Sequence, residues 1–169
     1  MTEARAAVTH IGGNSYGAPS YWLESGLWTV LADGAGTAGR HALFENRFRQ
    51  GAGAAPHLHA RHDEMMYVLD GEVTFLLGER QERVREGSLV FIPRGTVHAF
   101  RVDSAEARLL DQHSPAGFEA FITTLGQPAP KAALPPPGWK GPEIPPEDRA
   151  RLFEAIDQTN LDVPNPLKT

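Results

Sequence analysis

Three of the seven histidines of this 169-residue chain fall within six positions, in the stretch PHLHARHDE at residues 56–64. Successive side chains of a β-strand point to opposite faces, so His57 and His59 would share one face. Two imidazoles on one face form the first half of a metal site. Glu64 opens the next apolar run, which can return beside the first strand and bring a carboxylate to the same place.

A fourth ligand must come from a distant part of the chain. In the stretch PRGTVHAF at residues 93–100, a Pro-x-Gly turn delivers His98 to the head of another expected strand. Neutral imidazoles and one carboxylate suit Fe, Mn, Ni, Co, Cu or Zn. We therefore expect one divalent first-row transition metal per chain, held by His57, His59, Glu64 and His98. The alternative is a set of hydrogen-bonded histidines without a metal.

Short β-type runs separated by glycine turns precede about residue 113 and must position these side chains. Many short strands at this spacing predict an all-β sandwich or barrel and not alternating βαβ units. The expected strands are 27–32, 40–48, 56–59, 65–71, 72–77, 82–86, 88–93, 98–102 and 107–112.

A helix is expected in SPAGFEAFITTLG at residues 114–126, with Ser114 as N-cap, Pro115 at the first helical position and Gly126 as the stop. Its apolar stripe can close an open side of the β-core. The stripe consists of Phe118, Phe121, Ile122 and Leu125.

The remaining segment is rich in proline, with eight prolines between residues 127 and 146, and is expected to form an extended arm. A second short helix is expected at 146–156, with Leu152, Phe153 and Ile156 on its apolar face. We expect residues 1–126 to form the barrel with its capping helix. Residues 127–169 would pack on this barrel or on a partner subunit, and the alternative is a flexible terminus.

Composition excludes several classes of function. The net charge of −5 and the pI near 5.8 argue against nucleic-acid and anionic-membrane partners. There are no cysteines, so disulfides and thiolate metal sites are excluded. The N-terminal residues lack the apolar core of a signal peptide, and no run reaches the ~20 apolar residues of a membrane span. We expect a cytoplasmic protein.

Two motifs in this chain resemble those of the cupins. The first, G-x5-H-x-H-x3,4-E-x6-G, fits Gly51, His57, His59, Glu64 and Gly71, and the second fits Gly87, Pro93, Gly95 and His98. The last position of the second motif, usually Asn, is Val102 here. The resemblance covers roughly residues 40–112, with the motifs within 51–102. It implies a double-stranded β-helix, the jelly-roll barrel of the cupins, with a metal held by His57, His59, Glu64 and His98.

The flanking stretches YWLESGLWTVLADGAGTAGRHALFE and SPAGFEAFITTLG are similar to those of single-domain bacterial cupins of the quercetin 2,3-dioxygenase-like group. That resemblance implies a metal-dependent dioxygenase that opens a ring of a flavonol or a related enol. Tyr21, Trp22 and Trp28 would then line the entrance; alternatively, they hold the N-terminal segment on the barrel.

Within such a site, Glu64 has a second use as a catalytic group: if its bond to the metal is weak or dissociable, its carboxylate can take a proton from an incoming hydroxyl. Alternation from Glu64 and His98 turns Met66 and Phe100 inward as substrate-lining residues, while Val68 and Val102 fit the barrel core better. This lining is apolar, so we expect a small hydrophobic or aromatic substrate, with dioxygen as the second reactant.

Two other classes of function fit the same residues: an oxygen-independent, metal-assisted isomerase, cyclase or lyase, and a non-enzymatic small-molecule-binding cupin. A homodimer is expected because antiparallel barrels of this size leave sheet edges to be covered. The remaining histidines receive no ligand role: His62 is placed with Asp63 at the rim or surface, His41 in the core or at the surface, and His10 and His113 are unassigned.

Overall fold

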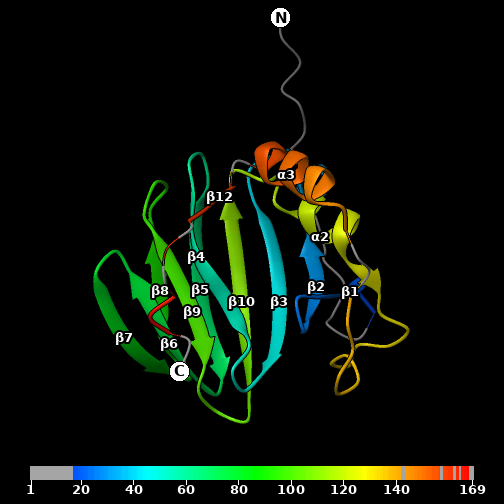
Figure 1. Ribbon diagram of the computed structural model, residues 1–169. Helices are drawn as coiled ribbons and strands as arrows, with labels where there is room; N and C mark the ends of the chain where they lie inside the picture. The colour runs from blue at the N-terminus through cyan, green and yellow to red at the C-terminus, as the bar shows by residue number, and fades with distance from the viewer. Residues whose placement is uncertain (1–16, 142–143, 157, 162, 164, 168–169) are drawn as a thin grey trace, which may run out of the picture.

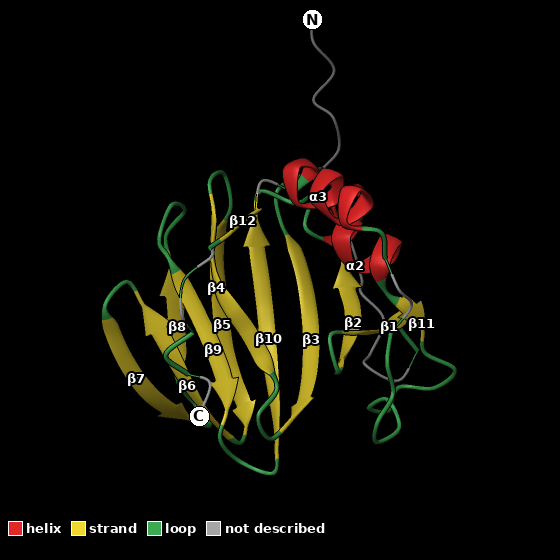
Figure 2. Ribbon diagram, viewed as in Figure 1, coloured by secondary structure: helices red, strands yellow, loops and turns green. Residues whose placement is uncertain are grey.

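Alternating apolar side chains pack two antiparallel sheets face to face, with helices over one end (Figure 1; Figure 2). This computed structural model describes residues 17–141, 144–156, 158–161, 163 and 165–167. The larger sheet has the strand order β11-β1-β2-β3-β10-β5-β8. Its strands are β1 (Ser20–Leu23), β2 (Gly26–Ala32), β3 (Ala42–Arg49), β5 (Asp63–Asp70), β8 (Leu89–Ile92), β10 (Glu106–Ser114) and β11 (Gln127–Pro128).

The smaller sheet has the order β12-β4-β9-β6-β7. Its strands are β4 (Gly53–His59), β6 (Glu72–Leu77), β7 (Arg80–Arg85), β9 (His98–Val102) and β12 (Gln158–Asn160). All pairings in both sheets are antiparallel. The predicted all-β jelly-roll barrel is confirmed, and each of the nine predicted strands is present within a few residues of its expected bounds.

The core lies between the sheets. On β10 the inward positions are Ala107, Leu109, Asp111 and His113, so the strand carries an apolar half and a polar half on one face. The apolar half packs with aromatic side chains of both sheets, among them Phe48, Phe75 and Phe100. Phe48 and Phe100 lie on different sheets with ring centroids 5.4 Å apart. The polar half of β10 lies where the predicted metal ligands gather.

The helix predicted at residues 114–126 begins later than expected. Helix α2 (Glu119–Leu125) has Phe118 at its N-cap, while Ser114 is the last residue of β10 and pairs with Asp63. Ser114 therefore pairs in the sheet and does not cap the helix, and its hydroxyl donates to the Arg40 carbonyl. Gly126 does end the helix, and Phe121, Ile122 and Leu125 are buried against the core as predicted.

The C-terminal part folds back on the barrel. Gln127 and Pro128 pair with β1, and α3 (Pro146–Ala155) places the Phe153 ring 5.4 Å from that of Phe121. Strand β12 then pairs with β4 and covers the edge that carries His57 and His59. These contacts are within one chain, and the domain division at residue 126 stays a prediction.

Three strands (β1, β11 and β12) and one helix were not predicted. Helix α1 (Gly34–Thr37) is a single turn capped by Asp33, whose carboxylate accepts from the Gly36 amide. Strands β11 and β12 have two and three residues and no apolar alternation, so they form only because a longer strand offers its edge. Among the described residues, no helix has the length and apolarity to cross a membrane.

Candidate metal centre

Strand β4 turns His57 and His59 into the barrel, where 7% and 2% of their surface is exposed, while Leu58 lies on the other face. The neighbouring strand β9 places His98 directly opposite His57 in the antiparallel register. The ring centroids of His57 and His98 are 4.1 Å apart, and those of His57 and His59 are 5.0 Å apart. One sheet therefore supplies three converging imidazoles.

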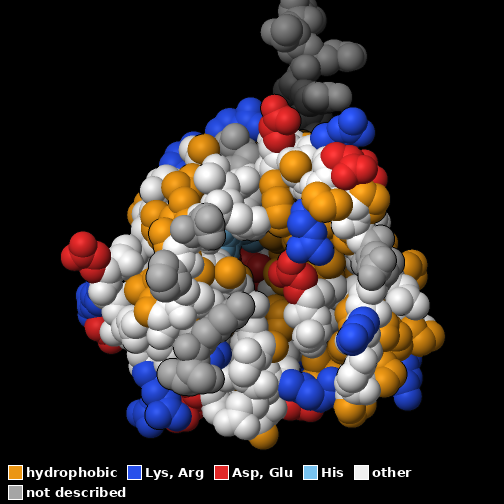
Figure 3. Space-filling model, in the orientation of Figure 1, with side chains coloured by type: hydrophobic (Ala, Val, Ile, Leu, Met, Phe, Trp, Pro, Cys, Tyr) orange, Lys and Arg blue, Asp and Glu red, His pale blue; other side chains and the backbone are white. Residues whose placement is uncertain are grey.

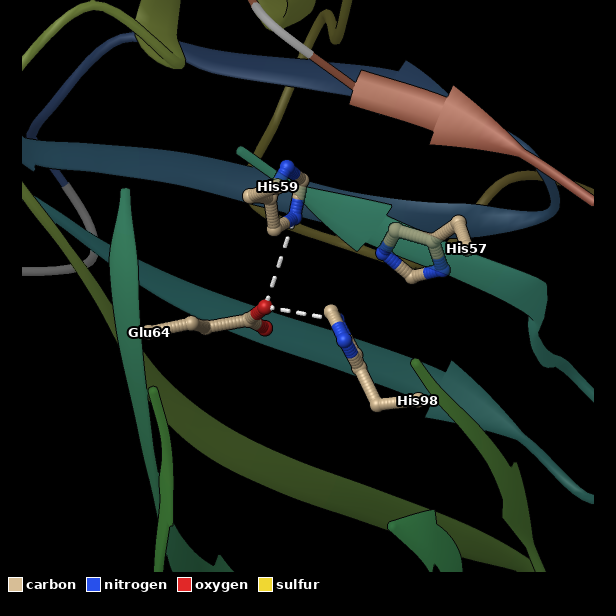
Figure 4. Close-up of side chains that lie close together, drawn as sticks. All are labelled: His57, His59, Glu64 and His98. Carbon is tan, nitrogen blue, oxygen red and sulfur yellow. Dashed lines mark ion pairs between the residues drawn. The ribbon is translucent and has the colours of Figure 1, made fainter. Parts of the chain in front are cut away.

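The carboxylate comes from the other sheet. Glu64, the second residue of β5, points across the sandwich toward these histidines (Figure 4). Its Oε2 lies 3.4 Å from His59 Nε2 and 3.0 Å from His98 Nε2. All four side chains are buried, and one potential ligand atom from each lies within 4.8 Å of the others. The structure thus brings together the four residues predicted from the two sequence motifs.

Backbone carbonyls orient two of the imidazoles. His57 Nδ1 is 2.8 Å from the Ala55 carbonyl, and His98 Nδ1 is 2.9 Å from the Thr96 carbonyl. A carbonyl can only accept, so each Nδ1 carries the proton and donates it. This leaves Nε2 of each ring as the atom available to a cation, which is how the outer hydrogen bond of a metal-binding histidine sets its tautomer.

Burial also favours the protonation states that bind metals. It lowers the pKa of His57 to about 3, with a smaller contribution from His98, and it lowers the pKa of His59 as well. For Glu64, burial alone would raise the pKa, but the histidines around it hold this pKa well below its usual range. The centre therefore contains neutral imidazoles at His57 and His59 beside an ionised carboxylate.

His98 differs from the other two histidines. Burial lowers its pKa, but the adjacent Glu64 carboxylate more than offsets that effect, so the pKa of His98 is raised. A cation that bound its Nε2 would compete with a proton, so binding would release protons at pH values below this raised pKa.

Buried ligand atoms that make no hydrogen bond indicate whether a cation fits between these four residues. Glu64 Oε2 and His98 Nε2 are buried without a hydrogen bond of acceptable geometry, although they are 3.0 Å apart. Two ligand atoms bound to one ion at about 2.1 Å, at octahedral or tetrahedral angles, lie roughly 3.0–3.4 Å apart. The two measured separations from Glu64 fall in that interval, so the residues present fit a divalent cation.

A cavity of about 40 Å³ lies next to the cluster. The predicted lining residues Trp28, Met66 and Phe100 border it, together with Phe48, Phe118 and Phe121. Figure 3 shows a hollow near the middle of one face, with histidine and acidic side chains visible at its bottom.

Tyr21 is not among the residues that line this cavity. It lies on β1 opposite Trp28, and its ring packs near Gly126 at the end of α2. Trp22 is also elsewhere, with its ring 5.8 Å from that of Trp139 in the proline-rich arm. These two aromatic residues hold the N-terminal strand and the arm on the barrel, which was the alternative interpretation.

His62 is likewise not at the surface. Only 6% of it is exposed, because the loop before α2 covers it, with Gly117 facing its Nε2. Its neighbour Asp63 does lie at the rim, where Arg94 donates to its carboxylate over 2.7 and 3.0 Å. His41 is half-buried and precedes β3, away from the cavity, and His10 lies outside the described residues.

A second buried polar group, which was not predicted from the sequence, lies in the barrel. Asp111 and His113 are 0% and 1% exposed, and Asp111 Oδ1 lies 3.3 Å from His113 Nε2. Asn46 on β3 donates to Asp111 Oδ2 over 2.9 Å, and Phe118 stacks on His113 with ring centroids 3.9 Å apart. The signal was available in the stretch ARLLDQHS, where strict alternation puts both polar residues on the face of Leu109.

The part of the chain that carries this site matches a known domain. Residues 45–113 match the cupin domain. The chain is 28% identical to quercetin 2,3-dioxygenase of Bacillus subtilis over 152 residues, covering 84% of this chain and 42% of that enzyme. It is 39% identical to an uncharacterised protein of Aquifex aeolicus over 61 residues, covering 36% of this chain and 50% of that protein. The matches therefore span half or less of the length of these curated relatives.

Solved structures share the fold. KdgF from a Halomonas species superposes with a TM-score of 0.59 at 20% identity, over 66% of this chain and 98% of that one. An RmlC-like cupin from Shewanella frigidimarina gives 0.58 at 20% identity, over 66% and 96%. The domain match and the two packed sheets identify residues 45–113 as a cupin domain with the fold of these solved structures.

Proposed function

We propose that this protein is a metal-dependent dioxygenase that acts on a hydrophobic enol or phenol, with ring cleavage of a flavonol such as quercetin as the reference reaction. The observation that carries the proposal is the buried cluster of three histidines and one glutamate beside an aromatic-lined cavity. The similarity to quercetin 2,3-dioxygenase over most of this chain supports the reaction class.

In this proposal His57, His59, Glu64 and His98 hold one divalent first-row transition metal. The donor set accepts Fe, Mn, Ni, Co, Cu or Zn, so the cellular supply would decide which ion is bound. When bound, such an ion acts as a Lewis acid for an ionised substrate oxygen, and a redox-active one also allows chemistry with dioxygen.

Glu64 is the proposed proton acceptor. Because the pKa of its carboxylate is held low by the surrounding histidines, it is ionised and can accept the proton of an incoming enol or phenol hydroxyl. The apolar walls exclude water from the ionised substrate oxygen and strengthen its attraction to a cation.

The cavity walls favour an uncharged aromatic substrate. Among the described residues that line the cavity there is no lysine or arginine to pair with a carboxylate or phosphate. The volume of about 40 Å³ is far below the ~300 Å³ of a typical small-molecule site. Binding of a flavonol therefore requires side chains such as Phe118 and Phe121, at the start of and within α2, to move outward.

Oxygen uptake tests the proposal. Protein stripped of metal and reloaded separately with each candidate ion is mixed with a flavonol panel, in air and without oxygen. The expected result is oxygen consumption and substrate loss with at least one ion, and neither in the stripped protein or in His98→Ala.

The other outcomes overturn the proposal in distinct ways. Turnover that persists without oxygen would identify the metal-assisted isomerase, cyclase or lyase class. Substrate binding without turnover under any loading would identify a small-molecule-binding cupin. Sedimentation of the same samples tests the predicted homodimer, and fractionation of the producing cells tests the predicted cytoplasmic location.

A further inference from the structure

A second group of potential metal ligands shares Glu64 with the cluster of His57, His59, Glu64 and His98. Glu64, Asp111 and His113 each offer a ligand atom within 4.8 Å of the others, and all three are buried. Asp111 and His113 are two residues apart on one face of β10, and the antiparallel register sets His113 directly opposite Glu64 on β5. Glu64 therefore belongs to both groups, at the junction between the two sheets.

Several atoms of this second group make no hydrogen bond. Asp111 Oδ1 and both ring nitrogens of His113 are buried without a hydrogen bond, although Oδ1 and Nε2 face each other at 3.3 Å. Asn46 donates to Oδ2 of Asp111 and so leaves Oδ1 for another partner, while the amide oxygen of Asn46 is itself unpartnered. Leaving buried polar atoms unsatisfied is costly, so a group that binds both Asp111 Oδ1 and His113 Nε2 is expected.

The charges of the buried carboxylates also favour a bound cation. Glu64 and Asp111 are two buried carboxylates, and neither has a lysine or arginine among the described residues that line the cavity. A cation on the histidine cluster would be shared with Glu64 and not with Asp111. The partner that the structure gives Asp111 Oδ1 is the His113 imidazole, 3.3 Å away, which carries a charge only when it is protonated. Buried carboxylates are usually paired with cationic side chains or with metal ions.

We infer that Asp111, His113 and Glu64 form a second cation position, with Glu64 as a carboxylate shared between the two ions. The inference rests on the proposed function, because it uses the metal that His57, His59 and His98 would hold. The 3.3 Å separation between Asp111 Oδ1 and His113 Nε2 matches two ligands of one ion at about 2.1 Å.

The donor set identifies the kind of ion. Two carboxylates and one imidazole make an oxygen-rich site, which suits Mn²⁺ better than softer ions. The cavity of about 40 Å³ also borders all three residues and exceeds the ~30 Å³ share of a water molecule that would complete the coordination.

Metal counting tests the inference with Mn²⁺ as the probe. Stripped protein is dialysed against Mn²⁺ at a concentration that saturates the wild type, and bound metal per chain is measured by elemental analysis. We expect about two ions in the wild type, and about one in Asp111→Asn, in His113→Gln and in His98→Ala, since each change removes ligands of one position only. His41→Gln removes a histidine outside both groups and should keep about two.

The results separate the second position from the first. One ion in the wild type, lost in His98→Ala and kept in Asp111→Asn, would overturn the second position and leave the proposed function intact; Asp111 and His113 would then be a closed ion pair. No bound ion in the folded wild type would overturn both. Circular dichroism of each variant verifies folding, and Asp111→Asn, which keeps the shape of the side chain, serves if His113→Gln does not fold.

Discussion

The Glu64 carboxylate and the His98 imidazole lie 3.0 Å apart although they belong to different sheets of the barrel. Strand β5 carries Glu64 on the larger sheet, and β9 carries His98 on the smaller one. An ion held between them would join the two sheets at a point where the packing is polar. Metal binding should therefore be linked to the stability of the whole sandwich.

Metal should stabilise the wild type and not His98→Ala. An ion that binds only the folded state at a concentration of 100 times its Kd adds about 2.7 kcal/mol to the free energy of unfolding. Urea denaturation with and without a saturating divalent ion measures this difference, and His41→Ala is the matched control, expected to respond like the wild type. Equal stabilisation of wild type and His98→Ala would show that the ion binds elsewhere.

Gly53 of β4 should not tolerate a side chain. A Cβ at this position would lie 1.9 Å from the carbonyl oxygen of Phe100, so Gly53→Ala must push β4 away from β9. We expect a loss of more than about 2 kcal/mol in the free energy of unfolding, together with weaker metal binding in the folded fraction, because β4 and β9 carry the three histidines.

Gly78→Ala is the comparison for this prediction. Unlike Gly53, Gly78 has a positive φ, of 61°, and a Cβ there meets nothing within 4 Å, so we expect a loss of about 1 kcal/mol from backbone strain alone. Urea midpoints of the two variants decide the matter. Equal losses would mean that the strands adjust to the added methyl group.

Asp103 should make stability depend on acid pH. Its carboxylate, 11% exposed, accepts from the Thr74 hydroxyl over 2.6 Å and from Arg101 over 2.9 Å. Burial alone would raise the pKa of Asp103, but these bonds outweigh it and lower the pKa. A pKa lower in the folded state stabilises the protein above the unfolded value of about 3.9, and this contribution is lost as the pH falls through the folded value.

We therefore expect Asp103→Asn to cost about 1–2 kcal/mol at pH 7 and progressively less below pH ~4. Denaturation curves between pH 3 and pH 7, approximately, measure this trend. Asp70→Asn replaces an exposed aspartate at the end of β5 and should change little. A cost for Asp103→Asn that does not vary with pH would contradict the assigned role of the carboxylate.

Trp139 should hold the proline-rich arm on the barrel. Its ring packs edge-on against Trp22, and the Trp22 indole donates to the Ala133 carbonyl over 2.8 Å. Trp139→Ala should release the arm, with a loss of about 1–2 kcal/mol and faster proteolytic cleavage after residue 126. Lys140→Ala, at an exposed neighbouring position, is the control, and unchanged cleavage in Trp139→Ala would point to other contacts as the anchor.

Local sequence patterns determined most of the strands and four residues of the candidate centre. Alternation along a strand decides which side chains share a face, so His57 and His59 could be assigned to one side from their spacing alone. Turn residues such as Pro93 and Gly95 likewise marked where His98 begins its strand. These features depend on neighbours a few residues away, and such neighbours are visible in the sequence.

Only the tertiary structure decided which strands become neighbours. Ser114 could have capped a helix, but the ladder to β5 draws it into β10, and His113 arrives opposite Glu64 by that pairing. Tyr21 lies outside the cavity because it packs at the end of α2, and His62 lies in the interior because the loop before α2 covers it. Strand pairing and sheet packing join residues far apart in the chain, and their free energy depends on all the partners at once, so no single stretch of sequence carries it.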